Sequence, residues 1–389
     1  MKEDRFGAFI DDGMNKEPTG NGILDGLSFA AKDIFAVRGH TNSAGNPTWK
    51  ATHRPAESNA PVIDALLKNG AELRGMTVTD ELMYSLKGDN IHFPPVINPR
   101  FPQAYTGGSS SGSAAAVAGG LTDFAIGTDT GGSVRIPSAY CGLFGMRPTH
   151  GSISTDGVVA LAPSFDTVGW MARSATVLEK VGRCLLPEQE QGDYRRFYRV
   201  NEAWDLVRSS SAGEAFSRAA ARLFPEKTLQ DYPLPGVTLP ELAETFRILQ
   251  GWEAWQSHGQ WIQTDHPHFG KDIADHFSAA SQVKKDAAYR RATVVKTRFA
   301  REMSRFLDRD AVLVLPTTYG PAPLRGISFA EGENIRAQTM KLSCIAGVSG
   351  LPQLTIPIVD RNHLLGLSLI SGRGTDRRLL TFACRLTAN

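Results

Sequence analysis

The chain has few cysteines, and they are far apart. There are four in 389 residues, Cys141, Cys184, Cys344 and Cys384. No two of them have the C-x-x-C spacing of a zinc site or redox pair, and their scatter does not indicate a disulfide framework. We therefore expect no metal site, and we expect reduced thiols of the kind found in the cytoplasm.

Long apolar runs are also missing. No segment approaches the ~20 apolar residues that span a bilayer. The first residues include two acids and are not followed by an apolar run, which differs from the pattern of a secretory signal. The sequence thus predicts a cytoplasmic protein with no membrane partner.

Neither sign of charge dominates the chain. The formal net charge is +2, and 21% of the residues are charged. This balance does not provide the basic field with which proteins bind nucleic acid. The glycine- and serine-rich segment 107–113 lacks the Gly-Lys-Ser/Thr ending of a phosphate-binding loop. We expect no nucleic-acid partner and no cofactor.

The first half of the chain has the pattern of an α/β fold. Between residues 24 and 170, short apolar runs alternate with small-residue helices and glycine turns, as in a sheet with helices packed on its faces. Residues 61–68 have apolar side chains at helical spacing, and 71–75 resemble a short strand. With 41% hydrophobic residues the chain can form a substantial core.

The second half is less regular. Residues 185–227 are polar and predict an insertion or a peripheral region. Helical periodicity returns over 239–261 and 273–307. Strands expected at 311–315 and 364–370 would return to the sheet that the first half begins.

These patterns predict one domain over residues 1–389. Its expected parts are a catalytic core at 24–175, a variable and mostly helical part at about 185–305, and returning core strands at 306–389.

Three segments carry the candidate chemistry, namely 26–32 (GLSFAAK), 107–113 (GGSSSGS) and 127–133 (GTDTGGS). In the third segment, two glycines precede a serine and allow main-chain N–H groups to converge, which is how an oxyanion hole is built. The predicted donors are the N–H groups of Thr130, Gly131, Gly132 and Ser133.

The two serine loops are expected to meet in space. Residues 113–120 have the composition of a small-residue helix, and 124–127 that of a short buried strand. Eight helical residues advance about 12 Å and four strand residues return about 13 Å. If the two run antiparallel, Ser109 and Ser133 return to the same edge of the sheet.

A lysine is the best candidate for the base. Serine is a poor nucleophile at its own pKa and needs a neighbouring base. None of the nine histidines is near either serine loop in the sequence, which leaves open a histidine that the fold brings there. Lys32 ends the apolar run 27–31, so it should be partly buried, and burial lowers the pKa of a lysine toward neutrality.

Lys32, the serine-glycine loop and residues 127–142 (GTDTGGSVRIPSAYCG) resemble the amidase signature family of serine amidohydrolases. The resemblance implies the fold of that family, an α/β fold with a large mixed central β-sheet covered by helices on both faces. It also implies a catalytic triad. Lys32 would be the base, Ser109 the relay whose preceding peptide bond is cis, and Ser133 the attacking group.

Within that family the chain looks most like small plant-type indole-3-acetamide hydrolases, through residues 6–10 and 164–170. The expected activity is therefore hydrolysis of a small amide such as an arylacetamide. The alternatives are hydrolysis of another small amide or a carbamate, or, in a different class, a glutaminase-like subunit of a tRNA-dependent amidotransferase. The expected partners are the amide substrate and, as an option, a second copy of the chain.

Four further residues are predicted to contact the substrate, namely Met83, Ser110, Asp129 and Arg135. Arg135 has two interpretations, since it can pair with a substrate carboxylate or anchor Asp129, and the second is favoured. An arginine facing an open pocket would favour an acidic substrate, whereas apolar, aromatic walls would favour an arylacetamide. Some tryptophans can supply such walls or pack in the helical half, among them Trp252, Trp255 and Trp261.

Overall fold

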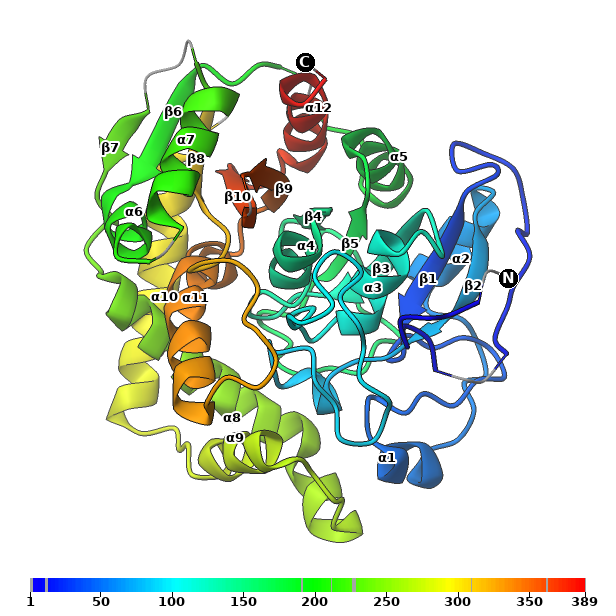
Figure 1. Ribbon diagram of the computed structural model, residues 1–389. Coiled ribbons are helices and arrows are strands. Elements are labelled where there is room, and N and C mark those ends of the chain that lie inside the picture. The colour runs from blue at the N-terminus through cyan, green and yellow to red at the C-terminus, as the bar shows by residue number, and fades with distance from the viewer. Residues whose placement is uncertain are drawn as a thin grey trace.

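A ten-stranded sheet runs through the computed structural model, in the order β2-β1-β3-β5-β4-β9-β10-β8-β6-β7. The structure describes residues 3–10, 13–189, 192–210, 212–225, 229–308, 310–361 and 363–388. The strands are β1 (Ser28–Lys32), β2 (Glu72–Thr77), β3 (Phe124–Thr128), β4 (Phe144–Arg147), β5 (Val168–Ala172), β6 (Arg196–Val200), β7 (Gln230–Tyr232), β8 (Ala311–Pro316), β9 (Gln353–Asp360) and β10 (His363–Ser371). The first two strands lie at the right of Figure 1, and β6 and β7 lie at the upper left.

The sheet is mixed, as the family resemblance implied. Strand β1 runs parallel to both β2 and β3, and β6 runs parallel to β7 and β8. The pairs between β3 and β8 are antiparallel. Because the parallel strands β1 and β3 end at the same edge, their last residues, Lys32 and Thr128, are brought together there.

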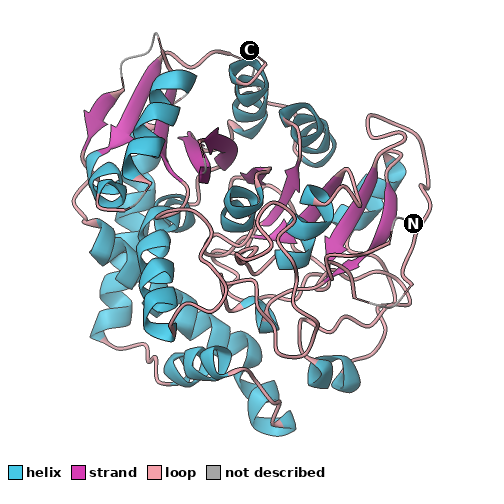
Figure 2. Cartoon of the chain, in the orientation of Figure 1, coloured by secondary structure: helices cyan, strands magenta, loops and turns pink. Residues whose placement is uncertain are grey.

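Helices cover both faces of the sheet (Figure 2). They are α1 (Pro47–Thr52), α2 (Pro61–Lys68), α3 (Ser111–Ala118), α4 (Arg135–Cys141), α5 (Ala175–Leu185), α6 (Asn201–Arg208), α7 (Gly213–Leu223), α8 (Leu239–Asp265), α9 (Lys271–Ser281), α10 (Ala287–Phe306), α11 (Phe329–Ser349) and α12 (Asp376–Leu386), with a 3-10 turn at Glu81–Met83. No helix within the described ranges combines the length and the apolar character that crossing a bilayer requires.

Strand β5 shows the two covered faces directly. A Cβ atom added at Gly169 would lie 3.1 Å from Val134, which caps α4. The next residue, Trp170, donates its indole N–H to the carbonyl of Leu178 in α5. Because successive strand residues point to opposite faces, α4 and α5 lie on opposite sides of the sheet.

Several predicted elements are confirmed. The helix at 61–68 is α2, the strand at 124–127 is β3, and the strands at 311–315 and 364–370 are β8 and β10, which join the sheet of the first half. The predicted helix at 273–307 is wrong as a single element, because it divides into α9 and α10. The reason is Asp286, whose carboxylate accepts the N–H groups of Ala288 and Tyr289 and thereby starts a new helix.

The polar stretch 185–227 is not only peripheral. It contains α6, α7 and the strand β6, which pairs with β8 and extends the sheet. Residues 190–191, 211 and 226–227 of this stretch lie outside the described residues. Its polar composition reflects its position at the sheet's end, where only one side of each helix is covered.

Candidate active site

Lys32 lies at the end of β1 and is fully buried. Its Nζ donates to the hydroxyl of Ser109 at 2.7 Å and to the hydroxyl of Thr128 at 3.1 Å. The lysine predicted as base and the serine predicted as relay are therefore in direct contact. Thr128, at the end of the neighbouring strand β3, was not singled out by the sequence reasoning; the parallel pairing of β1 and β3 places it there.

Ser109 is held through its main chain. Its carbonyl accepts the N–H of Asp80 at 3.2 Å and the hydroxyl of Thr79 at 3.0 Å. The peptide bond between Gly108 and Ser109 is cis, as the family resemblance implied. These contacts fix the backbone that carries the hydroxyl facing Lys32.

The two serine loops meet, as expected. The main-chain N–H of Ser110 donates to the carbonyl of Ser133 at 3.3 Å. Between them the chain passes along α3 and returns along β3, which pack against each other. Ser133 is almost fully buried and borders a cavity.

Burial lowers the pKa of Lys32 to about 7 from an ordinary value of 10.5, although Asp80, Asp166 and Asp129 act in the opposite direction. The cause is desolvation, because the ammonium form loses its hydration in the interior. A lysine with this pKa is partly uncharged near neutral pH, and an uncharged amine can accept a proton.

The predicted oxyanion loop has donors available, but not all four. The N–H of Gly132 donates to Oδ1 of Asp129 at 3.0 Å, so the structure removes it from the predicted set. Within the described part of the chain, the N–H groups of Thr130, Gly131 and Ser133 have no hydrogen-bond acceptor. Gly132 instead allows the loop a backbone conformation that other residues disfavour. Its φ is +127°, a value that is unfavourable for any residue with a Cβ.

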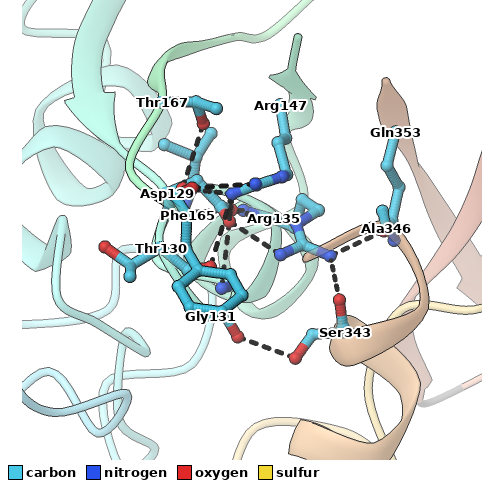
Figure 3. Close-up of polar contacts among 12 residues, drawn as sticks. Asp129, Thr130, Gly131, Arg135, Arg147, Phe165, Thr167, Ser343, Ala346 and Gln353 are labelled. Carbon is cyan, nitrogen blue, oxygen red and sulfur yellow. Dashed lines mark hydrogen bonds and ion pairs between the residues drawn. The ribbon is translucent and has the colours of Figure 1, made fainter. Parts of the chain in front are cut away.

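A buried ion cluster supports this loop (Figure 3). Oδ1 of Asp129 lies 2.7 Å from Nη2 of Arg135 and 3.0 Å from Nη1 of Arg147. Its Oδ2 accepts the N–H groups of Val134 and Arg135 at 3.0 and 3.2 Å. Burial alone would raise the pKa of Asp129, but the two guanidinium groups hold it well below its ordinary value.

This geometry corrects part of the predicted substrate contacts. Asp129 and Arg135 are fully buried and bonded to each other, and neither borders the cavity. Ser110 is also fully buried, and its hydroxyl faces the carbonyl of Thr128 at 3.4 Å. The structural interpretation of Arg135 is thus the right one, and of the four residues Met83 lies in the cavity wall.

The cavity beside Ser133 has a volume of about 220 Å³. Apolar walls come from Met83, Leu86, Val283 and Met340, and polar groups from Tyr84, Arg247, Gln250, His276 and Arg336. Trp252, Trp255 and Trp261 are not among its lining residues. A second cavity of about 230 Å³ adjoins it and shares Ser85, Leu86 and Arg336 as a common wall.

Two charged residues near the site, Arg147 and Asp166, are not among the site residues predicted from the sequence. Asp166 accepts the hydroxyl of Thr130 at 2.5 Å and the N–H groups of Leu161 and Ala162. A signal was present, because isolated charges within small-residue or apolar segments have to be paired when buried. Across the described residues there is no group of three or more His, Cys, Asp or Glu side chains arranged to hold a metal ion.

Known proteins resemble this chain in both sequence and fold. A family model described as Amidase matches residues 11–212. Amidase 1 of Arabidopsis thaliana is 37% identical, over 98% of this chain and 98% of that protein. One subunit of the glutamyl-tRNA(Gln) amidotransferase of Thermus thermophilus is 31% identical, over 92% of this chain and 84% of that protein. A solved structure described as an amidase superposes with a TM-score of 0.83 and 26% identity, over 95% of this chain and 86% of that one.

Proposed function

The chain belongs to the amidase family, and on that premise we propose that it hydrolyses a small carboxamide to a carboxylate and ammonia through an acyl-enzyme on Ser133. The observation that carries the proposal is the buried Lys32, whose Nζ contacts the hydroxyl of Ser109 next to the loop of Ser133. A neutral amine, a hydroxyl in contact with it and a second serine on the adjoining loop are the parts of a proton relay.

The reaction proceeds in two halves. Ser133 Oγ attacks the amide carbon while its proton passes through Ser109 to Lys32. The oxygen that becomes negative is bound by the free N–H groups of the loop at Thr130, Gly131 and Ser133. The C–N bond then breaks, and the nitrogen leaves as ammonia with the proton returned by the lysine. Water then attacks the acyl-enzyme, and its proton passes through Ser109 to Lys32 as before. This step releases the carboxylate and restores Ser133.

For the acyl group, we propose an arylacetamide, with indole-3-acetamide as the named candidate. The apolar side chains of Met83, Leu86 and Met340 in the cavity wall support a hydrophobic acyl group. The aromatic rings among the lining residues are those of Tyr84 and His276, both polar, so the support comes from aliphatic and thioether contacts and less from aromatic stacking.

A second candidate is an amide that also bears a carboxylate, glutamine included. Two guanidinium groups, those of Arg247 and Arg336, border the cavity, and arginine is the preferred partner of carboxylates. Each already contacts a glutamate on its own helix, Arg247 with Glu244 and Arg336 with Glu333. An acidic substrate would therefore have to compete with these glutamates for the arginines.

The proposed reaction is tested with Ser133→Ala. The purified parent protein should release ammonia from a primary amide and should bind a fluorophosphonate covalently. The variant should lose at least about 1,000-fold in turnover, as nucleophile removal does in other serine hydrolases, and should lose the label. Ser152→Ala is a matched control, because Ser152 lies in a turn and is not among the residues that line the cavity. A Ser133→Ala protein that still turns over and labels would refute the assignment.

The acyl group is tested with a panel of amides of graded size, aromaticity and charge. An arylacetamide substrate predicts that kcat/KM rises with aromatic size and is insensitive to Arg336→Gln. A carboxylate-bearing substrate predicts the opposite, with KM rising in Arg336→Gln. Hydrolysis by the purified protein without tRNA or partner would exclude an obligate amidotransferase component. The cytoplasmic location and the optional homodimer stay predictions.

A further inference from the structure

Asp80 is a buried carboxyl group that the proposed mechanism does not use. It follows β2, immediately before the turn at Glu81–Met83, and is fully buried. Its Oδ2 accepts the N–H of Gly88 at 3.0 Å. Its Oδ1 has no hydrogen-bond partner among the residues that the structure describes. A buried and half-satisfied carboxyl destabilises the fold, so its presence calls for a functional explanation.

Asp80 contacts the proposed relay segment at two points. Its main-chain N–H donates to the carbonyl of Ser109. Its carboxyl group lies against the preceding residue, because a Cβ atom added at Gly108 would be 2.1 Å from Oδ2. The hydroxyl of the same Ser109 contacts Nζ of Lys32. The main chain of Asp80 and the amine of Lys32 thus both contact Ser109, and the carboxyl of Asp80 lies against the residue before it.

The charges that face this pair come from several elements. Lys32 on β1 interacts electrostatically with Asp80, and also with Asp129 and Asp166 in the loops after β3 and before β5. Asp80 faces Lys32 and, from its own loop, Asp89. Asp129 is already bonded to two arginines, and Asp166 to a hydroxyl and two N–H groups. The carboxyl of Asp80, by comparison, is compensated by the N–H of Gly88 and, more weakly, by the hydroxyl of Ser85.

The pKa values of Asp80 and Lys32 are shifted in opposite directions. Burial raises the pKa of Asp80 to about 7, while the N–H of Gly88 and the charge of Lys32 act against this rise. Burial lowers the pKa of Lys32 to about 7, and Asp80 is the first of the charges that act against this fall. The charge of each group therefore favours the charged form of the other.

We propose that Asp80 is a positioning residue that controls the protonation of Lys32 and thereby sets the pH above which the lysine can act as a base. The proposal rests on the proposed function, since it takes Lys32 as the base for Ser133. The ionised carboxylate stabilises the ammonium form of the lysine. Removing that negative charge lets the lysine lose its proton at lower pH.

The test is the pH dependence of fluorophosphonate labelling, which needs no identified substrate. In this reaction Ser133 Oγ forms a bond to phosphorus, fluoride leaves, and the serine proton passes to Lys32. The labelling rate should therefore rise with pH as the lysine becomes neutral. The variant is Asp80→Asn, which keeps an oxygen acceptor for the N–H of Gly88 but removes the charge.

The expected result is a shift of the rising limb to lower pH by about one unit in Asp80→Asn. At one unit below the parent midpoint, the variant should label roughly fivefold faster than the parent when each rate is expressed relative to its own plateau. Asp89→Asn is the matched control. Its carboxyl is half-exposed and paired with Lys87, so solvent screens it and its limb should not move.

The outcomes separate the two proposals. If Asp80→Asn lowers the labelling rate by the same factor at every pH, and the rising limb of the pH profile does not shift, Asp80 is only structural. This proposal is then overturned. If the parent does not label, or if Ser133→Ala labels equally well, the proposed function has failed instead. Asp80→Ser removes the same charge if the Asn variant does not fold. Loss of folding in both variants would also overturn the proposal, because the carboxyl would then be a requirement of the fold.

Discussion

Nη1 of Arg135 donates a hydrogen bond of 2.6 Å to Oε1 of Gln353, a residue 218 positions away in the chain. The same Nη1 donates to the carbonyl of Ser343 in α11. Since Arg135 also binds Asp129, the loop that carries Ser133 is tied to β9 and α11 through one fully buried guanidinium group. The first half of the chain and the C-terminal strands are thus coupled at the proposed site.

The first prediction concerns this ion cluster. Asp129→Asn leaves the guanidinium groups of Arg135 and Arg147 buried without their counter-charge, and breaking a buried pair in this way typically destabilises a protein by about 3–5 kcal/mol. Chemical denaturation should show this loss in the free energy of unfolding. Labelling of Ser133 should fall as well, because Asp129 also accepts the N–H of Gly132.

Asp231→Asn is the control for that experiment. Asp231 pairs with Arg199, and both side chains are about half exposed. Solvent already satisfies such a pair, so the denaturation midpoint should hardly change. Equal midpoints for the two variants would mean that the cluster around Asp129 does not stabilise the loop.

The second prediction concerns the backbone before Ser133. In Gly132→Ala the new Cβ would lie 2.6 Å from Cδ1 of Ile136, at a φ of +127°. The loop has to shift, and its free N–H groups lose their common direction. Loss of oxyanion donors elsewhere lowers kcat by about 100- to 1,000-fold, and we expect a loss of that order in amide hydrolysis.

Gly120→Ala isolates the effect of backbone strain. Gly120 also has a positive φ, +71°, but no atom lies within 4 Å of a Cβ placed there. Its substitution should reduce stability modestly, as a Cβ in the left-handed region does, and leave the turnover near that of the parent. A Gly132→Ala protein with parental turnover would argue against this loop as the oxyanion hole.

The third prediction concerns stability against pH. The pKa of Lys32 is about 7 in the folded protein and 10.5 ordinarily. Between these values the unfolded chain binds more protons than the folded one, so the free energy of unfolding rises with pH across that interval. Lys32→Met removes this penalty. The variant should be inactive yet more stable, by on the order of a few kcal/mol at or below pH 7, with the gain fading as the pH approaches 10.5.

Thermal unfolding at several pH values measures this effect. Lys50→Met is a suitable control, because Lys50 is exposed to solvent in the last turn of α1. A stability gain that grows with pH, or a Lys32→Met protein that is less stable than the parent at pH 6, would contradict the assignment of a largely neutral, desolvated amine.

Local pattern predicted much of the fold. The helix at 61–68 and the strand at 124–127 were found because their apolar spacing follows one secondary structure and proline or glycine marks their ends. The break between α9 and α10 was missed, since the cap formed by Asp286 lies inside a stretch with continuous helical periodicity. The strand β6 was missed for a related reason, because a strand near the end of a sheet need not be apolar.

The site, like the fold, has features that the sequence determines and features that depend on the tertiary structure. The sequence by itself determined which groups are available and in what order, namely Lys32 after an apolar run and two serine loops joined by a helix and a strand. Only the tertiary structure decided between the two interpretations of Arg135, removed the N–H of Gly132 from the free donors, and placed Asp80 against Gly108 and Ser109. Desolvation and Coulomb interactions depend on distances between residues remote in the chain, and local sequence does not contain those distances.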